Sequence, residues 1–277
     1  MGETMVEAAN ANGAAVPKLL ARRQGNALHI VLNAPPANAL SRTMMTELRA
    51  ALDAGVADPG VRTIVIAANG KVFSAGHDLK ELTAHRQDDD GGRGFYEATM
   101  RQCADLMLAI QRAPKPVVAV VEGLATAAGC QLVASCDLAI CTDKAEFATP
   151  GVNIGLFCST PMVALSRNVA PKQAMEMLLT GERIDASQAK AFGLVNRVVP
   201  KEYLQAVVTK YLDEIGAKPP RVLAVGKEAF YRQREMPVGE AYDYTARVMV
   251  ENMMMADAEE GIDAFVEKRE PTWQAPE

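Results

Sequence analysis

Two stretches of small residues carry the pattern of a chemical site. The run 119–141 reads as a strand, a turn rich in glycine and alanine, and a helix, and the run 69–80 places a second small-residue turn after another strand. Small residues let a ligand approach the backbone, and free N–H groups at a helix start favour an oxygen that carries negative charge. A close-packed turn without a ligand fits the first run equally well.

Motifs for several other chemistries are absent from the sequence. It contains three histidines and no G-x-S-x-G elbow, so nothing indicates a serine triad. It has no P-loop, no dinucleotide fingerprint after a strand, and no His/Cys cluster with metal-ligand spacing. We therefore expect no bound metal.

The composition is that of a water-exposed globular chain. Of 277 residues, 49% are hydrophobic and 23% charged, and no apolar run reaches the roughly 18 residues of a membrane span. The net charge of −5 removes a general attraction to nucleic acid. The odd number of cysteines and their unpaired spacing indicate reduced core residues of a cytoplasmic protein. These cysteines are Cys103, Cys130, Cys136, Cys141 and Cys158.

The first 17 residues match no targeting segment. They contain Glu3 and Glu7, no arginine and no long apolar core. We expect a flexible N-terminal tail over 1–17.

Strands and helices alternate through the first half of the chain. Apolar β-rich runs predict strands over 28–32, 63–68, 116–121 and 138–142. Helical spacing predicts helices from Ser41 to the Asp-Pro-Gly turn at 58–60 and over 95–112, with an exposed mobile loop at 85–94. This order predicts an α/β fold with ligands at strand ends.

Helices dominate the second half. Segments 162–169, 171–179 and 185–192 read as helices, and 194–199 as a last short strand. Four more helices are expected over 201–217, 220–235, 238–256 and 258–269, divided by prolines and a polar break. The run 253–255 of three methionines is typical of adaptable packing, such as a contact with another subunit.

With both turns in view, the sequence resembles the crotonase, or enoyl-CoA hydratase/isomerase, family. The resemblance rests on F-S-A-G-H-D-L-K-E-L at 73–82, K-P-V-V-A-V-V-E-G at 115–123, A-A-G-C-Q-L-V-A-S-C-D at 127–137 and A-F-V-E-K-R at 264–269. It runs from about residue 18 to 273. Within the family, the runs 123–137 and 147–161 look like the enoyl-CoA hydratase domain-containing protein 3 subgroup.

The resemblance implies an architecture and a ligand. It implies a crotonase-like α/β spiral of ββα repeats over 18–200 and a C-terminal helical trimerisation region over 201–277. The implied substrate is an acyl-CoA thioester, with no cofactor beyond the CoA that belongs to the substrate. The implied partner is a second copy of the chain, in a homotrimer or a dimer of trimers, with neither nucleic acid nor membrane.

The resemblance also assigns roles to residues of the two turns. The thioester oxygen is expected between the backbone N–H groups of His77 and Ala128, because such donors stabilise the charge that develops on it. The family usually has glycine at the second position, and a backbone donor survives alanine if the turn keeps its geometry. The expected CoA-binding residues are Ala37, Ala75, Asp78, Leu79, Lys80, Phe265 and Lys268.

Three of these residues have more specific expected roles. Phe265 is expected near the adenine of a neighbouring subunit. Lys80 and Lys268 are phosphate partners by resemblance, and a solvated surface charge is an equal alternative for each.

The sequence departs from the family at the two acid positions. Family hydratases place one glutamate in G-C-E and a second after the F-x-x-P run, whereas this chain has Gln131 and Gly151. Neither residue exchanges a proton near neutral pH. Hydration or simple isomerisation by the family mechanism is therefore not expected. Glutamate at both positions is expected to raise hydration.

Other side chains offer partial substitutes. His77 follows an Ala-Gly pair as in methylmalonyl-CoA decarboxylase, a family member without the glutamate pair, and its imidazole is a candidate partner for an acyl carboxylate. Cys158, Ser159 and Thr160 are candidates for lining the acyl pocket. Since no base is evident beside Cys158, a pocket-lining thiol is a better reading than a nucleophile.

Three functional hypotheses follow. The first is an acyl-CoA enzyme that keeps the oxyanion site and works by decarboxylation or thioester hydrolysis. The second is a non-catalytic CoA-thioester binder or an oligomeric scaffold. The third is a weak enoyl-CoA hydratase of fatty-acid metabolism.

Overall fold

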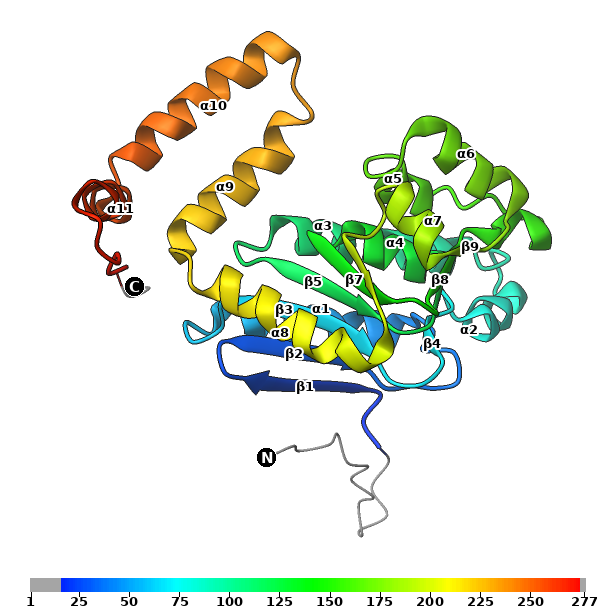
Figure 1. Cartoon of the computed structure of the whole chain (residues 1–277). Helices are drawn as coiled ribbons and strands as arrows, with labels where there is room; N and C mark the ends of the chain where they lie inside the picture. Colours follow the sequence, from blue (N-terminus) through cyan, green and yellow to red (C-terminus); the bar gives the residue numbers. More distant parts are fainter. Residues whose placement is uncertain (1–15, 275–277) are drawn as a thin grey trace.

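Successive strands divide between two sheets, as the computed structural model of the chain shows for the described residues 16–274 (Figure 1). The larger sheet has the order β1-β2-β3-β5-β7-β10 and the smaller one β4-β6-β8-β9. The larger sheet contains β1 (Leu19–Gln24), β2 (Ala27–Leu32), β3 (Thr63–Ala68), β5 (Val117–Val121), β7 (Leu138–Thr142) and β10 (Arg197–Val199). The smaller sheet contains β4 (Val72–Ser74), β6 (Leu124–Thr126), β8 (Glu146–Ala148) and β9 (Ile184–Asp185).

This division repeats along the chain. The strands β3, β5 and β7 are parallel neighbours in the larger sheet, and the strand that follows each, β4, β6 or β8, joins the smaller sheet. A helix follows each pair before the next repeat begins. The predicted spiral of ββα repeats is confirmed, and it brings the carboxyl ends of β4, β6 and β8 to one edge.

The helices of the body begin and end largely where sequence signals place them. They are α1 (Arg42–Ala57), α2 (Leu79–Ala84), α3 (Arg93–Arg112), α4 (Ala128–Ser135), α5 (Pro161–Leu165), α6 (Pro171–Thr180), α7 (Ala186–Ala191) and α8 (Lys201–Gly216). The Ser41 hydroxyl caps α1 by accepting from the Met44 N–H, and Gly181 ends α6 in the left-handed conformation.

In the first half, one strand was not predicted, and one segment predicted as a loop is a loop only in its middle part. The edge strand β1 was not predicted, because its mostly exposed residues L-L-A-R-R-Q lack the alternation that marks a half-buried strand. The loop expected at 85–94 contains a 3₁₀ turn, η1 (His85–Gln87), and the first turn of α3. His85 stacks on Phe95, with ring centroids 3.6 Å apart, and this contact joins the two ends of the segment.

Each face of the larger sheet has its own apolar cluster. Ile64 and Ile66 of β3 belong to the main core with Leu48 of α1, whereas Val65 between them packs in a second cluster with Leu204 of α8. The alternation along β3 thus serves two helical layers. Because α8 covers the sheet, the expected C-terminal region 201–277 is divided between the body and an arm.

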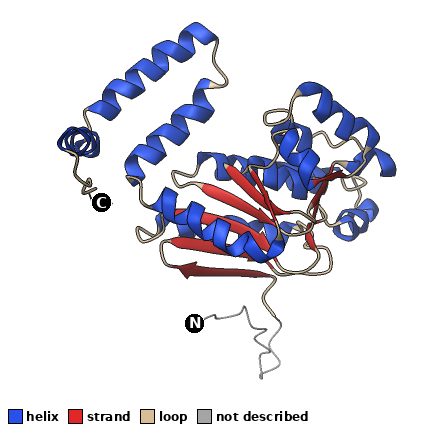
Figure 2. Ribbon diagram, in the orientation of Figure 1, coloured by secondary structure: helices blue, strands red, loops and turns tan. Residues whose placement is uncertain are grey.

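The arm consists of α9 (Pro220–Gln233), α10 (Val238–Met253) and α11 (Ala256–Glu267) and extends away from the sheets (Figure 2). A partly buried ion pair ties it to the body. Lys227 Nζ lies 2.6 Å from the Asp137 carboxylate, which also accepts from the Tyr231 hydroxyl at 2.9 Å. Large apolar side chains on its outer faces are more than half exposed. They include Tyr242, Met249, Val250, Met253, Met254 and Phe265.

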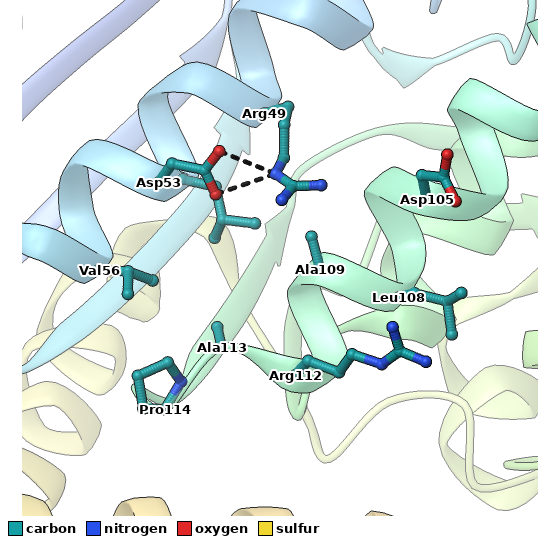
Figure 3. A pocket seen from close by; sticks show the side chains of 10 residues that line it. Arg49, Asp53, Val56, Asp105, Leu108, Ala109, Arg112, Ala113 and Pro114 are labelled. Carbon is teal, nitrogen blue, oxygen red and sulfur yellow. Dashed lines mark hydrogen bonds and ion pairs between the residues drawn. The ribbon is translucent and has the colours of Figure 1, made fainter.

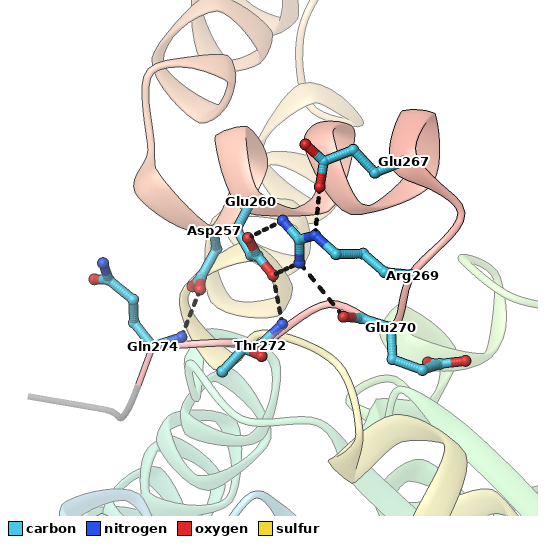
Figure 4. Close-up of polar contacts among 7 residues, drawn as sticks. All are labelled: Asp257, Glu260, Glu267, Arg269, Glu270, Thr272 and Gln274. Atoms are coloured by element: carbon cyan, nitrogen blue, oxygen red, sulfur yellow. Dashed lines mark hydrogen bonds and ion pairs between the residues drawn. The ribbon is translucent and has the colours of Figure 1, made fainter.

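The last residues fold back onto the arm (Figure 4). The Arg269 guanidinium donates to both oxygens of Glu260, at 2.7 and 2.8 Å, and lowers the pKa of that carboxyl to about 2. Trp273 Nε1 donates to the Ala217 carbonyl at 2.9 Å, just after α8. The chain end therefore connects α11 to the body. Within residues 16–274, none of the helices is long and apolar enough to cross a bilayer.

Candidate functional site: two facing turns

The two turns singled out in the sequence lie directly against one another. They follow β4 and β6, which are neighbouring parallel strands. Gly76 adopts φ 87°, and a Cβ built on it would lie 2.9 Å from the Ala127 Cβ and 3.0 Å from the Ala128 nitrogen. Only glycine allows this approach, so Gly76 fixes the distance between the turns.

The amides of His77 and Ala128 are free donors at this contact. The Gly76 carbonyl accepts from the Leu40 N–H at 2.8 Å, and Leu40 and His77 form an isolated parallel β-bridge. This pairing holds the backbone of the first turn on one side. Ala128 is the first residue of α4, where an N–H has no acceptor within the helix. Among residues 16–274 neither amide donates to an acceptor.

The second turn holds an unusual backbone conformation. Ala127 has φ 51° and ψ −121°, a region that glycine favours and that costs another residue about 1–3 kcal/mol. Its N–H donates to the Ala148 carbonyl at the end of β8, at 3.0 Å. This bond keeps the Ala128 amide at the start of the helix despite the strain. Ala128, where the resembled family usually has glycine, is the first residue of α4 and keeps a free backbone N–H.

Burial favours the neutral form of the His77 ring, and one hydrogen bond selects its tautomer. Its Nδ1 lies 3.3 Å from the Leu40 carbonyl, which only accepts, so Nδ1 carries the hydrogen. Burial lowers the pKa of His77, while the Leu40 carbonyl and the Glu81 carboxylate oppose this to a lesser degree. Nε2 is left as a buried acceptor with no partner in the described part of the chain. A lone pair does not bind an acyl carboxylate, so the ring is better suited to accept a proton.

The first acid position is occupied by a buried amide. Gln131 lies on α4 and is 4% exposed, and its Oε1 accepts from the Cys103 thiol at 3.8 Å. Burial raises the pKa of Cys103 to about 12, so that thiol stays protonated and remains the donor. Neither group exchanges a proton near neutral pH.

The second acid position has no room for a side chain. Gly151 lies in the 3₁₀ turn η2 (Pro150–Ile154), and its N–H donates to the Cys158 sulfur at 3.3 Å. A Cβ there would lie 2.7 Å from the Leu156 carbonyl oxygen and 2.9 Å from that sulfur. The structure therefore argues against the expectation that a glutamate at 151 restores hydration, because Cys158 and the loop fill the space.

The three candidates for the acyl pocket differ in exposure. Cys158 is buried, Ser159 is exposed and Thr160 is half-buried. Burial raises the pKa of the Cys158 thiol, which does not favour a nucleophile. Ile154, Leu156 and Phe157 before it are exposed apolar side chains.

The expected CoA-binding residues fall into two groups. The Ala75 N–H donates to the Ala37 carbonyl at 2.9 Å, which joins these two positions beside the first turn. Asp78 caps α2 by accepting from two backbone N–H groups, and the Leu79 and Lys80 side chains are exposed. The second group, Phe265 and Lys268, lies on the arm, and the structure does not bring it to the turns of the same chain (Figure 1).

Sequence reasoning missed Asn38, which holds the first turn in place. Asn38 is fully buried at φ 45°, its Oδ1 accepts from the Ala34 N–H at 2.7 Å, and its Nδ2 donates to the Asn69 and Val72 carbonyls at 2.8 and 2.7 Å. It thereby connects the loop that contains Ala37 to the start of β4. The only available signal was an asparagine in a proline-containing loop.

Two surface hollows lie apart from the turns. One of about 360 Å³ lies between α1 and α3, where Arg49 pairs with Asp53 (Figure 3). Another, of about 490 Å³, is lined by Arg42 and Gln102 among others. Neither includes His77 or Ala128. We place the site at the turns because their free amides supply chemistry that a surface hollow alone lacks.

Comparison with known proteins gives matches to one family over most of the chain. Residues 22–276 match the family model described as enoyl-CoA hydratase/isomerase. The chain is 46% identical over 259 residues to the enoyl-CoA hydratase domain-containing protein 3, mitochondrial, of Rattus norvegicus, covering 93% of this chain and 85% of that protein.

Solved structures show the same similarity. A crystal structure of enoyl-CoA hydratase from Mycobacterium smegmatis superposes with a TM-score of 0.88 at 50% identity, covering 93% of this chain and 99% of that one. The human enoyl-CoA hydratase domain-containing protein 3 gives 0.88 at 44% identity, covering 93% and 100%. These matches confirm the resemblance to the family and to that subgroup. The chain belongs to the enoyl-CoA hydratase/isomerase, or crotonase, family.

Proposed function

We propose that the chain binds an acyl-CoA thioester with its carbonyl oxygen between the amides of His77 and Ala128, and acts on it without a glutamate pair. One observation carries the proposal: the contact at Gly76 brings together two free backbone donors. Thioester reactions place negative charge on the carbonyl oxygen, and one donor removed from such a hole costs about 3–4 kcal/mol of transition-state stabilisation.

The chemistry at the acid positions separates this chain from a hydratase mechanism. Addition of water to a double bond needs one group for the water and another for the proton. Gln131 supplies an amide and Gly151 supplies no side chain, while Cys158 closes the space beside it. Thioester hydrolysis and decarboxylation remain, because both develop charge on the thioester oxygen and neither needs the pair.

The neutral His77 ring favours hydrolysis over decarboxylation. A malonyl-type carboxylate needs a donor or a cation, whereas His77 presents an acceptor nitrogen. Hydrolysis needs a base for water, which an imidazole lone pair provides. We therefore place hydrolysis first and decarboxylation second.

The arm supports self-association as part of the same proposal. Its outer faces expose large apolar side chains, including Phe265 at 86%, a pattern typical of an interface. In a homotrimer or dimer of trimers, Phe265 and Lys268 of a neighbouring copy would reach the CoA adenine and phosphates. No cofactor other than the CoA of the substrate is proposed. A cytoplasmic location stays a prediction, while the rat relative is named mitochondrial.

A panel of thioesters tests the function. Purified protein is incubated with saturated acyl-, enoyl- and malonyl-type CoA thioesters, products are followed by mass spectrometry, and melting temperature is measured with each. We expect stabilisation by several thioesters, release of free CoA from at least one, and negligible hydration of crotonyl-CoA.

The same experiment separates the alternatives. Stabilisation without turnover of any thioester would support a non-catalytic binder. No stabilisation by any member would leave an oligomeric scaffold. Robust hydration of crotonyl-CoA would show a hydratase whose acid groups lie elsewhere.

A further inference from the structure

The last described residues, 269–274, run back along one face of α11 (Figure 4). We call this segment the strap. The Arg269 guanidinium donates to both carboxylate oxygens of Glu260, at 2.7 and 2.8 Å, and the Thr272 N–H donates to the same carboxylate at 2.6 Å. A planar guanidinium that meets both oxygens fixes direction as well as distance. The first half of the strap is therefore held to α11 in one orientation.

Trp273 joins the strap to both α11 and the body. Its ring lies beside Gly261, where an added Cβ would come within 3.2 Å of the ring, and its Nε1 donates to the Ala217 carbonyl at 2.9 Å. The next residue, Gln274, donates its N–H to the carboxylate of Asp257, a residue of α11 that is only 6% exposed. The strap thus connects α11 with the residue that follows α8.

This connection closes the arm into a loop. Ala217 directly follows α8, and α9 begins at Pro220, so the hydrogen bond from Trp273 joins the end of the arm to its beginning. The arm is also tied to the body through α9, where Lys227 pairs with Asp137. The strap therefore fixes the far end of the three-helix arm, and with it the direction in which α11 points (Figure 1).

The two ties of the arm differ in burial. The Lys227 and Asp137 side chains are 8% and 16% exposed, whereas those of Arg269 and Glu260 are 42% and 24% exposed. Water competes for an exposed ion pair, so such a pair adds little stability and opens at low cost. The arm therefore has a firm attachment at α9 and a weaker one at the strap.

The closed strap sets which face of α11 is turned outward. It contacts α11 at positions 257, 260 and 261, whose spacing of three and four residues places them on one helical face. The large apolar residues of α11 belong to a different face and are 53%, 86% and 73% exposed; they are Ile262, Phe265 and Val266. A released strap would leave the direction of this apolar face free to change.

We propose that the strap is a releasable latch that holds the arm in the orientation in which Phe265 reaches the acyl-CoA of a neighbouring copy. The effect on the ligand rests on the proposed function, in which Phe265 of one copy lies near the CoA adenine of another. The closed latch fixes Phe265 before the ligand arrives, so less conformational freedom is lost on binding. With the latch open, the arm moves about its attachment at α9 and this contact with the ligand is lost.

Trp273 supplies the measurement, because it is the only tryptophan in the sequence. Its fluorescence therefore reports on the strap, and acrylamide quenches it more strongly when the ring is exposed to solvent. Arg269→Ala removes the contact with Glu260, and Gly261→Val places a larger side chain where even a Cβ comes within 3.2 Å of the ring. Both changes should open the latch, so we expect stronger quenching in each than in the wild type.

Thr272→Ala is the matched control within the strap. Thr272 contacts Glu260 through its backbone N–H and is itself exposed, so this variant keeps the latch and should show the quenching of the wild type. Far-ultraviolet circular dichroism checks that each variant keeps its helix content. Unchanged quenching in either Arg269→Ala or Gly261→Val, or an equal rise in Thr272→Ala, would overturn the latch.

An analogue of a saturated acyl-CoA tests the effect on the ligand. The analogue replaces the thioester sulfur by methylene, so it keeps the carbonyl and cannot be hydrolysed. We expect it to raise the melting temperature of the wild type and of Thr272→Ala, and to raise that of Arg269→Ala and of Phe265→Ala less. Because the latch acts through Phe265, the variant with both changes should lose no more stabilisation than Phe265→Ala alone.

The outcomes separate this inference from the proposed function. Equal stabilisation of the wild type and Arg269→Ala, or a further loss in the variant with both changes, would overturn the role of the latch in ligand binding. No stabilisation of the wild type would overturn the proposed function, whereas the quenching of Trp273 would still show whether the strap closes the arm.

Discussion

The two halves of the site differ in what they require of the sequence. The turn half consists of Gly76, His77, Ala127 and Ala128 and presents two free backbone amides. The acid half carries Gln131 and Gly151 where a hydratase has side-chain acids. A backbone donor depends on conformation and close packing, so it tolerates a change of side chain such as alanine at 128. A side-chain acid is lost with one substitution. Under the proposed function, the fold keeps the backbone donors for the thioester oxygen while the side chains at the acid positions change.

Packing strengthens the contrast. Asn38 and the Ala127–Ala148 hydrogen bond hold the turn half from both sides. In the acid half, the Cys158 sulfur accepts from Gly151 and occupies the space of a missing side chain. The acid half is thus closely packed and uncharged. Restoring one glutamate would not be enough to reopen it.

The largest effect should come from breaking the turn half at Gly76. Gly76→Val places a β-branched side chain at φ 87° and within 3.0 Å of the Ala128 nitrogen. We expect a loss of about 4 kcal/mol in the free energy of unfolding, from strain plus overpacking, together with loss of acyl-CoA binding. Urea denaturation and thermal shift measure the two effects.

Gly25 provides the control for this prediction. It also has a positive φ, 59°, but an added Cβ would meet nothing within 4 Å. Gly25→Ala should cost only about 1–2 kcal/mol and leave binding intact. Equal costs for the two variants would show that the contact between the turns is unimportant.

Removing the support of the first turn should have the next largest effect. Asn38→Ala leaves the Ala34 N–H and the Asn69 and Val72 carbonyls without their side-chain partner. We expect a loss of about 3 kcal/mol, because buried groups left unpaired cost about 1–3 kcal/mol each and water recovers part of that. Asn33→Ala, in the same loop, removes an exposed hydrogen bond to the Pro17 carbonyl and a partly buried one from the Asn69 amide, and should cost only about 1 kcal/mol. Similar losses in the two variants would contradict the role given to Asn38.

A smaller effect should follow from filling the acid half. Gly151→Ala places a methyl group 2.7 Å from the Leu156 carbonyl oxygen and 2.9 Å from the Cys158 sulfur. We expect a loss of about 2 kcal/mol. In combination with Cys158→Ala the cost should fall by about 1 kcal/mol, measured as a double-mutant coupling. A cost of Gly151→Ala near zero would mean that the acid half has room for a side chain.

The smallest effect concerns pH and again involves the turn half. Burial lowers the pKa of His77, so the unfolded chain takes up a proton at a higher pH than the folded chain does. The stability that the neutral ring contributes is therefore present above about pH 6.5 and is lost as pH falls below it. His77→Gln should reduce the stability lost between pH 7 and pH 5. Part of the loss should remain, since burial also lowers the pKa of His29.

Urea denaturation at the two pH values checks this prediction. An unchanged loss in His77→Gln would show that the ring is not held neutral. A steeper loss would contradict the direction of the pKa shift.

Local signals account for much of the fold that could be predicted. Pro171 and Gly181 bracket α6, and Asp185 opens α7 with a capping box, because these residues act through their own backbone neighbours. The strand β1 was missed because its stability comes from pairing with β2, which its exposed side chains do not reveal. The ion pair between Asp137 and Lys227 was missed because it joins segments distant in the sequence.

The candidate site was predictable only through resemblance. Composition and spacing marked two small-residue turns, and the family likeness supplied their pairing at His77 and Ala128. Three features of the site depend on neighbours in the folded structure. They are the contact through Gly76, the packing of Cys158 against Gly151, and the hydrogen bonds of Asn38. No local pattern encodes these contacts, so sequence reasoning proposed a glutamate where the fold leaves no room.

The position of a bound thioester carbonyl tests the central claim most directly. A crystal structure with the methylene analogue of a saturated acyl-CoA would show which groups surround that oxygen and the adjacent carbon. We predict the carbonyl oxygen at about 2.7–3.1 Å from both the His77 and Ala128 nitrogens. We also predict no carboxylate beside the carbon next to the carbonyl. A carbonyl oxygen bound away from either amide, or a glutamate or aspartate at that carbon, would contradict the account.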